Sequence, residues 1–252
     1  MRRGLLPAVL GAAVLLGGCA AAPASEPETT TSVRVFAAAS LTDVFGRIAG
    51  EFEDAHPGVE VELNFGGSSG LSAQLVEGAP ADVFAAASED TMAIVADAGL
   101  LAAPPVVFAR NRLEIAVPPG NPAGVTGLAD LARPELTVAL CDAGVPCGAA
   151  AAEVFDALGV AAAADTLEQD VKAVLTKVRL GEVDAGLVYR TDVLAAGDEV
   201  EGIPFPEAEA AVTAYPIAVV ADAATPESAE AFVRWVIDDS GALLEEAGFA
   251  AP

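Results

Sequence analysis

The sequence predicts an α/β fold built on a doubly wound sheet, and two observations support this prediction. Strand-like and helix-like patterns alternate from Val33 to the end of the chain. The hexapeptide VFAAAS occurs at positions 35–40 and again at 83–88, and each copy reads as a buried strand that leads into a helix. Two such units side by side predict parallel strands with crossover helices. Ligands of such sheets bind beyond the carboxyl ends of the strands.

Local signals predict the elements of the first half of the chain. Ser40, with Asp43 three residues later, resembles a capping box, and apolar residues at helical spacing follow it. His56 and the Pro-Gly pair after it end this helix. The next strand alternates apolar and polar side chains, so one of its faces is expected to be exposed to solvent. The expected strands are 33–36, 59–65 and the start of the second hexapeptide, and the later helices are 71–77 and 89–98.

The second half continues the alternation of strands and helices. Asp170 is expected to cap the helix that begins at Val171, because an aspartate side chain accepts hydrogen bonds from the free N–H groups of a first turn. One strand ends in Tyr189. The expected strands are 112–117, 137–140, 183–189 and 215–220, and the expected helices are 148–158, 171–178, 226–237 and 242–247.

Residues 1–18 have the pattern of a signal peptide. Arg2 and Arg3 form a basic start, positions 5–18 are apolar, and Leu-Gly-Gly-Cys ends the segment at Cys19. The apolar run is shorter than the ~20 residues of a membrane span, so a short membrane anchor and a buried helix are the weaker alternatives. The ending resembles a bacterial lipobox, in which Cys19 carries lipid. Residues 19–32 are then a lipidated N-terminus with a flexible tether, and the expected location is extracytoplasmic, anchored to the cell membrane.

The charge of the chain excludes nucleic acid as a partner. The sequence has 37 acidic and 12 basic residues, with a net charge of −25. Contacts with phosphate backbones need clusters of Lys and Arg. A small anionic ligand stays compatible, since exposed charges more than about 10 Å apart are screened at ~0.1 M salt and local dipoles decide a buried site. The length after the tether suits two small lobes or one large domain.

The cysteines favour a disulfide. With Cys19 assigned to lipid, Cys141 and Cys147 remain, close together in sequence and in an oxidising compartment. A metal site would need further Cys or His ligands, and the only histidine, His56, is distant in sequence. Two free thiols are the alternative.

Several predicted helices begin at residues suited to bind an anion. Ser40, Ser68, Cys147 and Val171 all lie at such starts, where free N–H groups and the positive end of the helix dipole are exposed. A serine there can also donate its hydroxyl proton. A deprotonated dianion offers only acceptors, so a cage of neutral donors accepts it and rejects protonated oxyanions. The alternative is that all four positions are ordinary helix caps.

The segment 35–44, VFAAASLTDV, resembles the opening of molybdate-binding proteins. Further matches follow in order and cover nearly the whole mature chain: 65–71, 77–83, 145–148, 170–171, 186–189, 215–220 and 247–249. The resemblance implies the type II periplasmic-binding-protein fold, in which two α/β lobes with doubly wound mixed sheets are joined by a hinge of two crossing strands. Lobe one would comprise 33–112 with 212–252, and lobe two would comprise 113–211.

The same resemblance implies a function and a ligand set. Proteins of this family capture molybdate or tungstate outside the cell membrane and deliver it to the permease of an ABC importer. This chain would do so as a monomer, without a cofactor and with a metal present only inside the oxyanion. The ligands would be the hydroxyls of Ser40, Ser68 and Tyr189 and the backbone amides of Cys147 and Val171. Another tetrahedral oxyanion, such as sulfate, is the alternative guest.

An enzyme alternative rests on the segment 66–70, GGSSG, which matches the G-x-S-x-G nucleophile elbow of α/β-hydrolases. In that fold the catalytic histidine follows the serine. His56 is the only histidine and precedes Ser68, and a serine without a base cannot be activated. The chain is therefore predicted not to be an enzyme. Ser88, in the second hexapeptide, is expected to be a plain helix cap.

Overall fold

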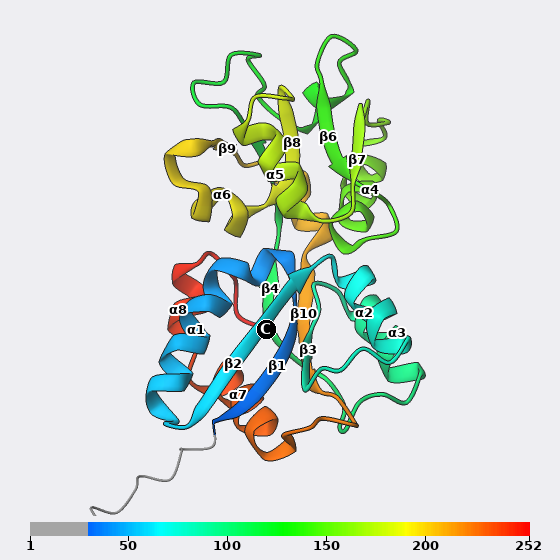
Figure 1. The fold of residues 1–252 in the computed structure, drawn as a ribbon. Coiled ribbons are helices and arrows are strands. Elements are labelled where there is room, and N and C mark those ends of the chain that lie inside the picture. The colour runs from blue at the N-terminus through cyan, green and yellow to red at the C-terminus, as the bar shows by residue number, and fades with distance from the viewer. Residues whose placement is uncertain (1–29) are drawn as a thin grey trace, which may run out of the picture.

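The computed structural model describes residues 30–252, which form two lobes, each built on a five-stranded mixed sheet with helices packed against it (Figure 1). The fold class predicted from the sequence is confirmed. The predicted signal peptide, 1–18, and the predicted lipidation site, Cys19, lie outside the described residues. Within the described residues, no helix has both the length and the apolar character needed to cross a membrane.

The sheet of the first lobe combines strands from both ends of the chain. Its strands are β1 (Thr31–Ala38), β2 (Val59–Gly66), β3 (Val83–Ala85), β4 (Val106–Asn111) and β10 (Thr213–Val219). Their order is β2-β1-β3-β10-β4. β1 is parallel to β2 and β3, whereas β10 is antiparallel to β3 and β4. The last strand of the chain thus closes a sheet that the first strands began.

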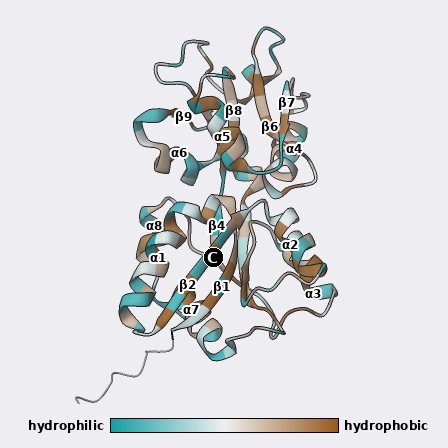
Figure 2. Cartoon of the chain, in the orientation of Figure 1, coloured by the Kyte–Doolittle hydropathy of each residue, from teal (hydrophilic) through white to brown (hydrophobic). Residues whose placement is uncertain are grey.

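Strand β1 is buried on both faces. Val35 and Ala37 pack into the core on one side of the sheet, and Phe36 packs on the other. β2 has the solvent-exposed face that the sequence predicts, and hydrophobic and hydrophilic residues alternate along it in Figure 2. β1 and β3 pair in parallel with Val35 opposite Val83, so the two VFAAAS segments lie side by side. Both segments therefore end at the same edge of the sheet.

Helices cover both faces of this first sheet. One face carries α1 (Thr42–Ala55), α7 (Pro226–Asp238) and α8 (Gly241–Glu246), and the other carries α2 (Ser68–Val76) and α3 (Glu89–Asp97). The aromatic rings of Phe52 and Phe232 join α1 to α7, with 5.3 Å between their centroids. Leu71 and Met92 join α2 and α3 in a separate apolar cluster. The first sheet is thus the middle layer of three.

The second lobe repeats the mixed arrangement. Its strands are β5 (Leu113–Val117), β6 (Val138–Cys141), β7 (Thr166–Glu168), β8 (Ala185–Tyr189) and β9 (Glu201–Ile203). Their order is β7-β6-β8-β5-β9, with β6 parallel to β7 and β8 and with β5 antiparallel to β8 and β9. The helices of this lobe are α4 (Pro146–Leu158), α5 (Val171–Arg179) and α6 (Arg190–Ala196). The 3-10 turns of the two lobes are η1 (Ala39–Leu41), η2 (Leu128–Ala132), η3 (Gly197–Glu199) and η4 (Pro206–Ala211).

Two chain segments connect the sheets. The chain leaves the first sheet between β4 and β5, where Arg112 is the single intervening residue, and it returns between η4 and β10 through Val212. Thr213 of β10 pairs with Asn111 of β4, so the two connections lie side by side (Figure 1). Adjacent connections of this kind allow two lobes to close about one hinge.

The structure corrects one helix start and confirms two others. The capping box predicted at Ser40 is wrong, because Ser40 lies in η1 and its hydroxyl contacts the Tyr215 hydroxyl at 2.8 Å instead of the backbone of α1. The caps predicted at Ser88 and Asp170 are confirmed. Each accepts a hydrogen bond from the backbone N–H three residues later, at 3.2 Å for Ser88 and 2.9 Å for Asp170. β1 begins at Thr31, two residues before the predicted start.

Candidate anion-binding site

A small cavity of about 20 Å³ lies between the two lobes, beyond the carboxyl ends of β1, β3 and β8. Its lining is Ala38, Ala39, Ser40, Gly67, Ser68, Ala87, Val145, Pro146, Cys147, Gln169, Asp170, Val171 and Tyr189. The structure thus brings together all five residues that the resemblance implies as ligands. The place is also where ligands bind in doubly wound sheets.

Two buried serines face this cavity from the first lobe. Ser40 follows β1 within η1, and Ser68 is the first residue of α2. Their exposed fractions are 5% and 2%. The backbone N–H of Ala87 donates to Ser68 Oγ at 3.0 Å. Because Ser68 Oγ already accepts there, its own proton is available to a guest in the cavity.

Two helix starts of the second lobe supply backbone donors. Cys147 is the second residue of α4, and Val171 is the first residue of α5. The N–H groups of a first turn have no partner within the helix, and the helix dipole adds positive charge there. A Cβ atom at Gly148 would overlap the carbonyl oxygen of Asp142, so glycine lets this loop pack closely behind the start of α4. Both starts are therefore suited to bind an anion.

Tyr189 contributes a buried hydroxyl at the end of β8. Its side chain is 1% exposed, and among the described residues its hydroxyl has no hydrogen-bond partner. Burial raises the pKa of Tyr189 above its usual value, so the phenol keeps its proton and can donate. A buried polar group without a partner costs about 1–3 kcal/mol. An acceptor placed in the cavity would remove this cost.

The disulfide predicted between Cys141 and Cys147 is present. It joins the end of β6 to the second residue of α4 and spans a sequence separation of 6 residues. Cys147 is therefore not a free thiol, and its backbone N–H remains available to the cavity. The bridge holds the loop that carries this amide.

Replacing both cysteines by serine is expected to lower the free energy of unfolding by about 2 kcal/mol. Without the cross-link the unfolded chain has more conformational entropy, which favours unfolding. Chemical denaturation of the variant and of the wild-type protein would measure this difference, provided that the free energy of unfolding depends on denaturant concentration with the same slope in both. Equal midpoints would show that the bridge is not stabilising.

Direct contacts join the lobes around the cavity. Ser69 Oγ of α2 donates to the Gly144 carbonyl oxygen at 2.8 Å, and this bond spans the lobes. Gly67 lies against the backbone of Gln169, where a Cβ atom would overlap the carbonyl oxygen. These contacts show the lobes closed upon each other.

An ion-pair cluster, which sequence reasoning missed, also crosses between the lobes. Lys172 Nζ of α5 lies 2.6 Å from Asp43 Oδ2 of α1 and 3.2 Å from Asp192 Oδ1 of α6. Burial raises the pKa of Asp192 to about 6, although Lys172 and the Tyr189 N–H oppose this shift. Burial lowers the pKa of Lys172, but the two carboxylates raise it by more, so the net shift is upward. Lys172 thus joins a buried carboxylate of one lobe to an exposed carboxylate of the other.

Asp43→Asn is expected to weaken ligand binding by roughly two- to five-fold, because a partly exposed ion pair contributes about 0.2–1 kcal/mol and this one forms between closed lobes. The loss should shrink at high salt. Calorimetry at two salt concentrations would measure it. Asp54→Asn is the control, because Asp54 lies in the same helix and forms no ion pair with another described residue. An effect of Asp43→Asn that is independent of salt would contradict this explanation.

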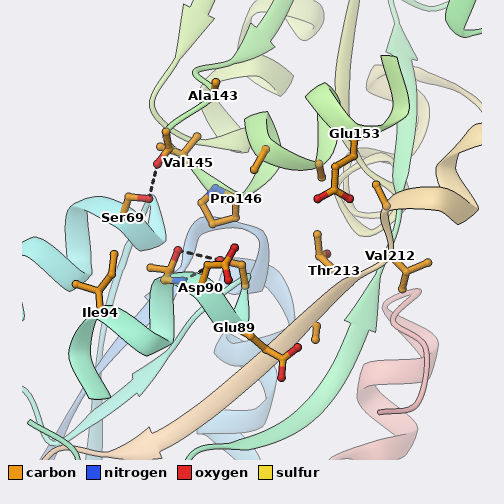
Figure 3. Close-up of a pocket in the computed structure, with 17 residues that line it drawn as sticks. Ser69, Glu89, Asp90, Ile94, Ala143, Val145, Pro146, Glu153, Val212 and Thr213 are labelled. Carbon is orange, nitrogen blue, oxygen red and sulfur yellow. Dashed lines mark hydrogen bonds between the residues drawn. The ribbon is translucent and has the colours of Figure 1, made fainter. Parts of the chain in front are cut away.

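A larger cavity of about 410 Å³ adjoins the small one and shares Val145 and Pro146 with it (Figure 3). Its lining carries the acidic residues Glu89, Asp90 and Glu153. Within residues 30–252, no cluster of three or more His, Cys, Asp or Glu side chains is arranged to hold a metal ion. The acidic outer cavity would repel an anion, so the attraction must come from the donors of the small cavity.

The structure does not support the hydrolase alternative. His56 Nδ1 lies 2.9 Å from the Phe52 carbonyl oxygen, and its ring stacks on Phe52 and packs against Trp235. Within the described residues, Ser68 Oγ accepts its hydrogen bond from the backbone N–H of Ala87. Among the described residues, Ser68 Oγ therefore has no histidine beside it to act as the base that the hydrolase mechanism needs.

Comparison with known proteins decides the family. The model of the bacterial extracellular solute-binding protein family matches residues 33–250. The chain belongs to this family. Its members bind solutes, which agrees with the prediction that the chain is not an enzyme, and the family description agrees with the predicted extracytoplasmic location.

Curated relatives match this solute-binding protein over nearly its whole length. The molybdate-binding protein ModA of Mycobacterium tuberculosis is 42% identical over 99% of this chain and 97% of its own. The putative ABC transporter substrate-binding lipoprotein YvgL of Bacillus subtilis is 30% identical over 97% and 96% of the two chains.

Solved structures share the fold of this solute-binding protein. The periplasmic molybdate-binding protein of Azotobacter vinelandii superposes with a TM-score of 0.77 at 22% identity, over 87% of this chain and 99% of its own. The sulfate-binding protein SubI of Mycobacterium tuberculosis gives 0.76 at 20% identity, over 88% and 87% of the two chains. At these identities the likeness concerns the fold alone.

Proposed function

We propose that this chain captures molybdate, or the similar tungstate, as a fully deprotonated dianion and delivers it to an ABC importer. The proposed ligands are the hydroxyls of Ser40, Ser68 and Tyr189 and the backbone amides of Cys147 and Val171. The observation that carries the proposal is the convergence of these neutral donors on one cavity, with the Tyr189 hydroxyl buried and without a partner among the described residues.

The chemistry of the cavity lining supports a dianion over a protonated oxyanion. Its one carboxylate, Asp170, already accepts a hydrogen bond as the cap of α5. A guest that carries a proton would have to donate it into a group of donors, which is unfavourable. Molybdate, tungstate and sulfate are deprotonated at neutral pH, whereas phosphate keeps a proton. The names of the curated relatives favour molybdate among these.

Sulfate is the second candidate, because the sulfate-binding protein SubI shares the fold. Sulfate offers the same charge and the same acceptors in a smaller tetrahedron. Donors placed for molybdate, the larger anion, would form longer and weaker hydrogen bonds to sulfate.

Delivery would follow from closure of the two lobes. We place the moving units at 33–112 with 212–252 and at 113–211, with the hinge at Arg112 and Val212. The contacts between Ser69 and Gly144 support a closed form that excludes water from the anion. A permease would receive this closed form, and a lipid on Cys19 would keep the monomeric receptor at the membrane surface.

A panel of oxyanions tests the proposal. Molybdate and tungstate at 100 times their dissociation constants should stabilise the protein by about 2.7 kcal/mol, which is a rise of roughly 5–10 °C in melting temperature. Sulfate and phosphate at the same concentrations should give much smaller shifts. Calorimetry would supply the affinities. A larger shift with sulfate would assign the protein to sulfate, and no shift with any of the four anions would overturn the proposal.

A further inference from the structure

A buried chain of hydrogen bonds lies behind Ser40. Ser40 Oγ is 2.8 Å from the hydroxyl of Tyr215, which is 0% exposed. The Nδ2 atom of Asn111 lies 3.5 Å from the same Tyr215 hydroxyl and 2.9 Å from Thr191 Oγ1. Asn111 is 3% exposed. The chain therefore runs from the cavity through β10 and the end of β4 to the second lobe.

The backbone fixes the orientation of the Asn111 amide. The N–H of Arg112 donates to Asn111 Oδ1 at 2.9 Å. A backbone N–H cannot act as an acceptor, so the oxygen of this amide must face it. The NH₂ group must then face Thr191 and Tyr215 with its two protons.

This orientation sets the direction of the remaining protons. Tyr215 accepts from Asn111, and the other hydrogen-bond partner of its hydroxyl within the described residues is Ser40 Oγ, so we assign the phenol proton to the bond with Ser40. Burial raises the pKa of Tyr215 well above the usual value for tyrosine, and the phenol therefore stays protonated. Ser40 Oγ accepts from Tyr215, and its proton is left to point into the cavity. Ser40 then resembles Ser68, which is held as a donor by the N–H of Ala87.

We infer that Asn111 and Tyr215 are positioning residues that hold Ser40 as a proton donor and thereby select fully deprotonated anions. The inference rests on the proposed function and assigns its specificity to two residues outside the cavity lining. Without the Tyr215 hydroxyl, both lone pairs of Ser40 Oγ become free, and the serine hydroxyl can rotate and accept a hydrogen bond from a protonated oxyanion. A guest such as hydrogen phosphate would then be tolerated better.

The test compares molybdate with phosphate at neutral pH in the mature protein. Calorimetry gives the molybdate affinity, and competition gives the phosphate concentration that halves molybdate binding. Tyr215→Phe is expected to weaken molybdate binding by about ten-fold and to leave phosphate binding unchanged or stronger. The preference for molybdate, defined as the ratio of the molybdate affinity to the phosphate affinity, should therefore fall at least ten-fold. In a Ser40→Ala background, Tyr215→Phe should change this preference little, because the hydroxyl that it orients is gone.

Each alternative outcome has a distinct meaning. An equal loss for both anions, a preference unchanged by Tyr215→Phe, or a full effect that persists in the Ser40→Ala background would overturn the inference. A wild-type protein that fails to bind molybdate would overturn the proposed function instead. Asn111→Ala provides a second variant if Tyr215→Phe does not fold, and it should shift the preference in the same direction by a smaller factor.

Discussion

Gly67→Ala is expected to reduce the affinity for the anion more than ten-fold while leaving the unliganded protein folded. A Cβ atom at this position would overlap the backbone carbonyl oxygen of Gln169 in the other lobe. A backbone oxygen cannot rotate away as a side chain can, so the lobes would stop short of closure. The donors of the second lobe would then remain too far from the guest to form short hydrogen bonds. Calorimetry and a thermal melt without ligand would measure the two properties separately.

Gly70→Ala is the matched control, because it adds the same methyl group three residues later, inside α2, whereas Gly67 is the residue that precedes this helix. A Cβ atom at Gly70 would meet no atom within 4 Å. This variant should bind the anion like the wild-type protein and be slightly more stable, since alanine favours a helix over glycine by roughly 0.5–1 kcal/mol. Equal affinities for the two variants would show that the contact between Gly67 and Gln169 does not limit closure.

Ser40→Ala is expected to weaken anion binding by about 1–3 kcal/mol, because a buried acceptor on the anion loses its donor. The repeated hexapeptide offers an internal control. Ser88 occupies the same place in the second copy, but its hydroxyl caps α3. Ser88→Ala should therefore lower the free energy of unfolding by about 1 kcal/mol and leave affinity unchanged. Wild-type affinity in Ser40→Ala would remove this serine from the proposed site.

Local pattern was sufficient to predict much of the fold. The VFAAAS repeat predicts β1 and β3 as parallel neighbours, because a short apolar strand followed by a helix start has few other arrangements. The cap at Asp170 is equally local, since its partner is three residues away. The five candidate ligands also lie at element ends that short-range signals indicate. Their convergence on one cavity could be expected only through the resemblance.

Long-range contacts account for what the sequence could not predict. Whether Ser40 caps a helix or bonds to Tyr215 depends on a residue 175 positions away. Lys172 and Asp43 form an ion pair although they are 129 positions apart in the sequence, and no local pattern indicates this contact. The strand predicted at 112–117 corresponds to β5 alone, and the prediction misses β4, which ends one residue before Arg112. Hydrophobic period alone does not show where a chain passes from one sheet to another.

The order of strands in the first sheet determines which of the two lobes would move when the protein opens and closes. β1 is the first strand of the described chain, α8 is its last helix, and both belong to the first lobe, whereas everything from Leu113 to Ala211 is an insertion between β4 and β10. Any tether attached at the N-terminus would therefore hold the first lobe. The inserted lobe would swing relative to that fixed base, and its outer surface would change position most between an empty and a loaded receptor. A membrane partner could distinguish the two states by the place of this one lobe.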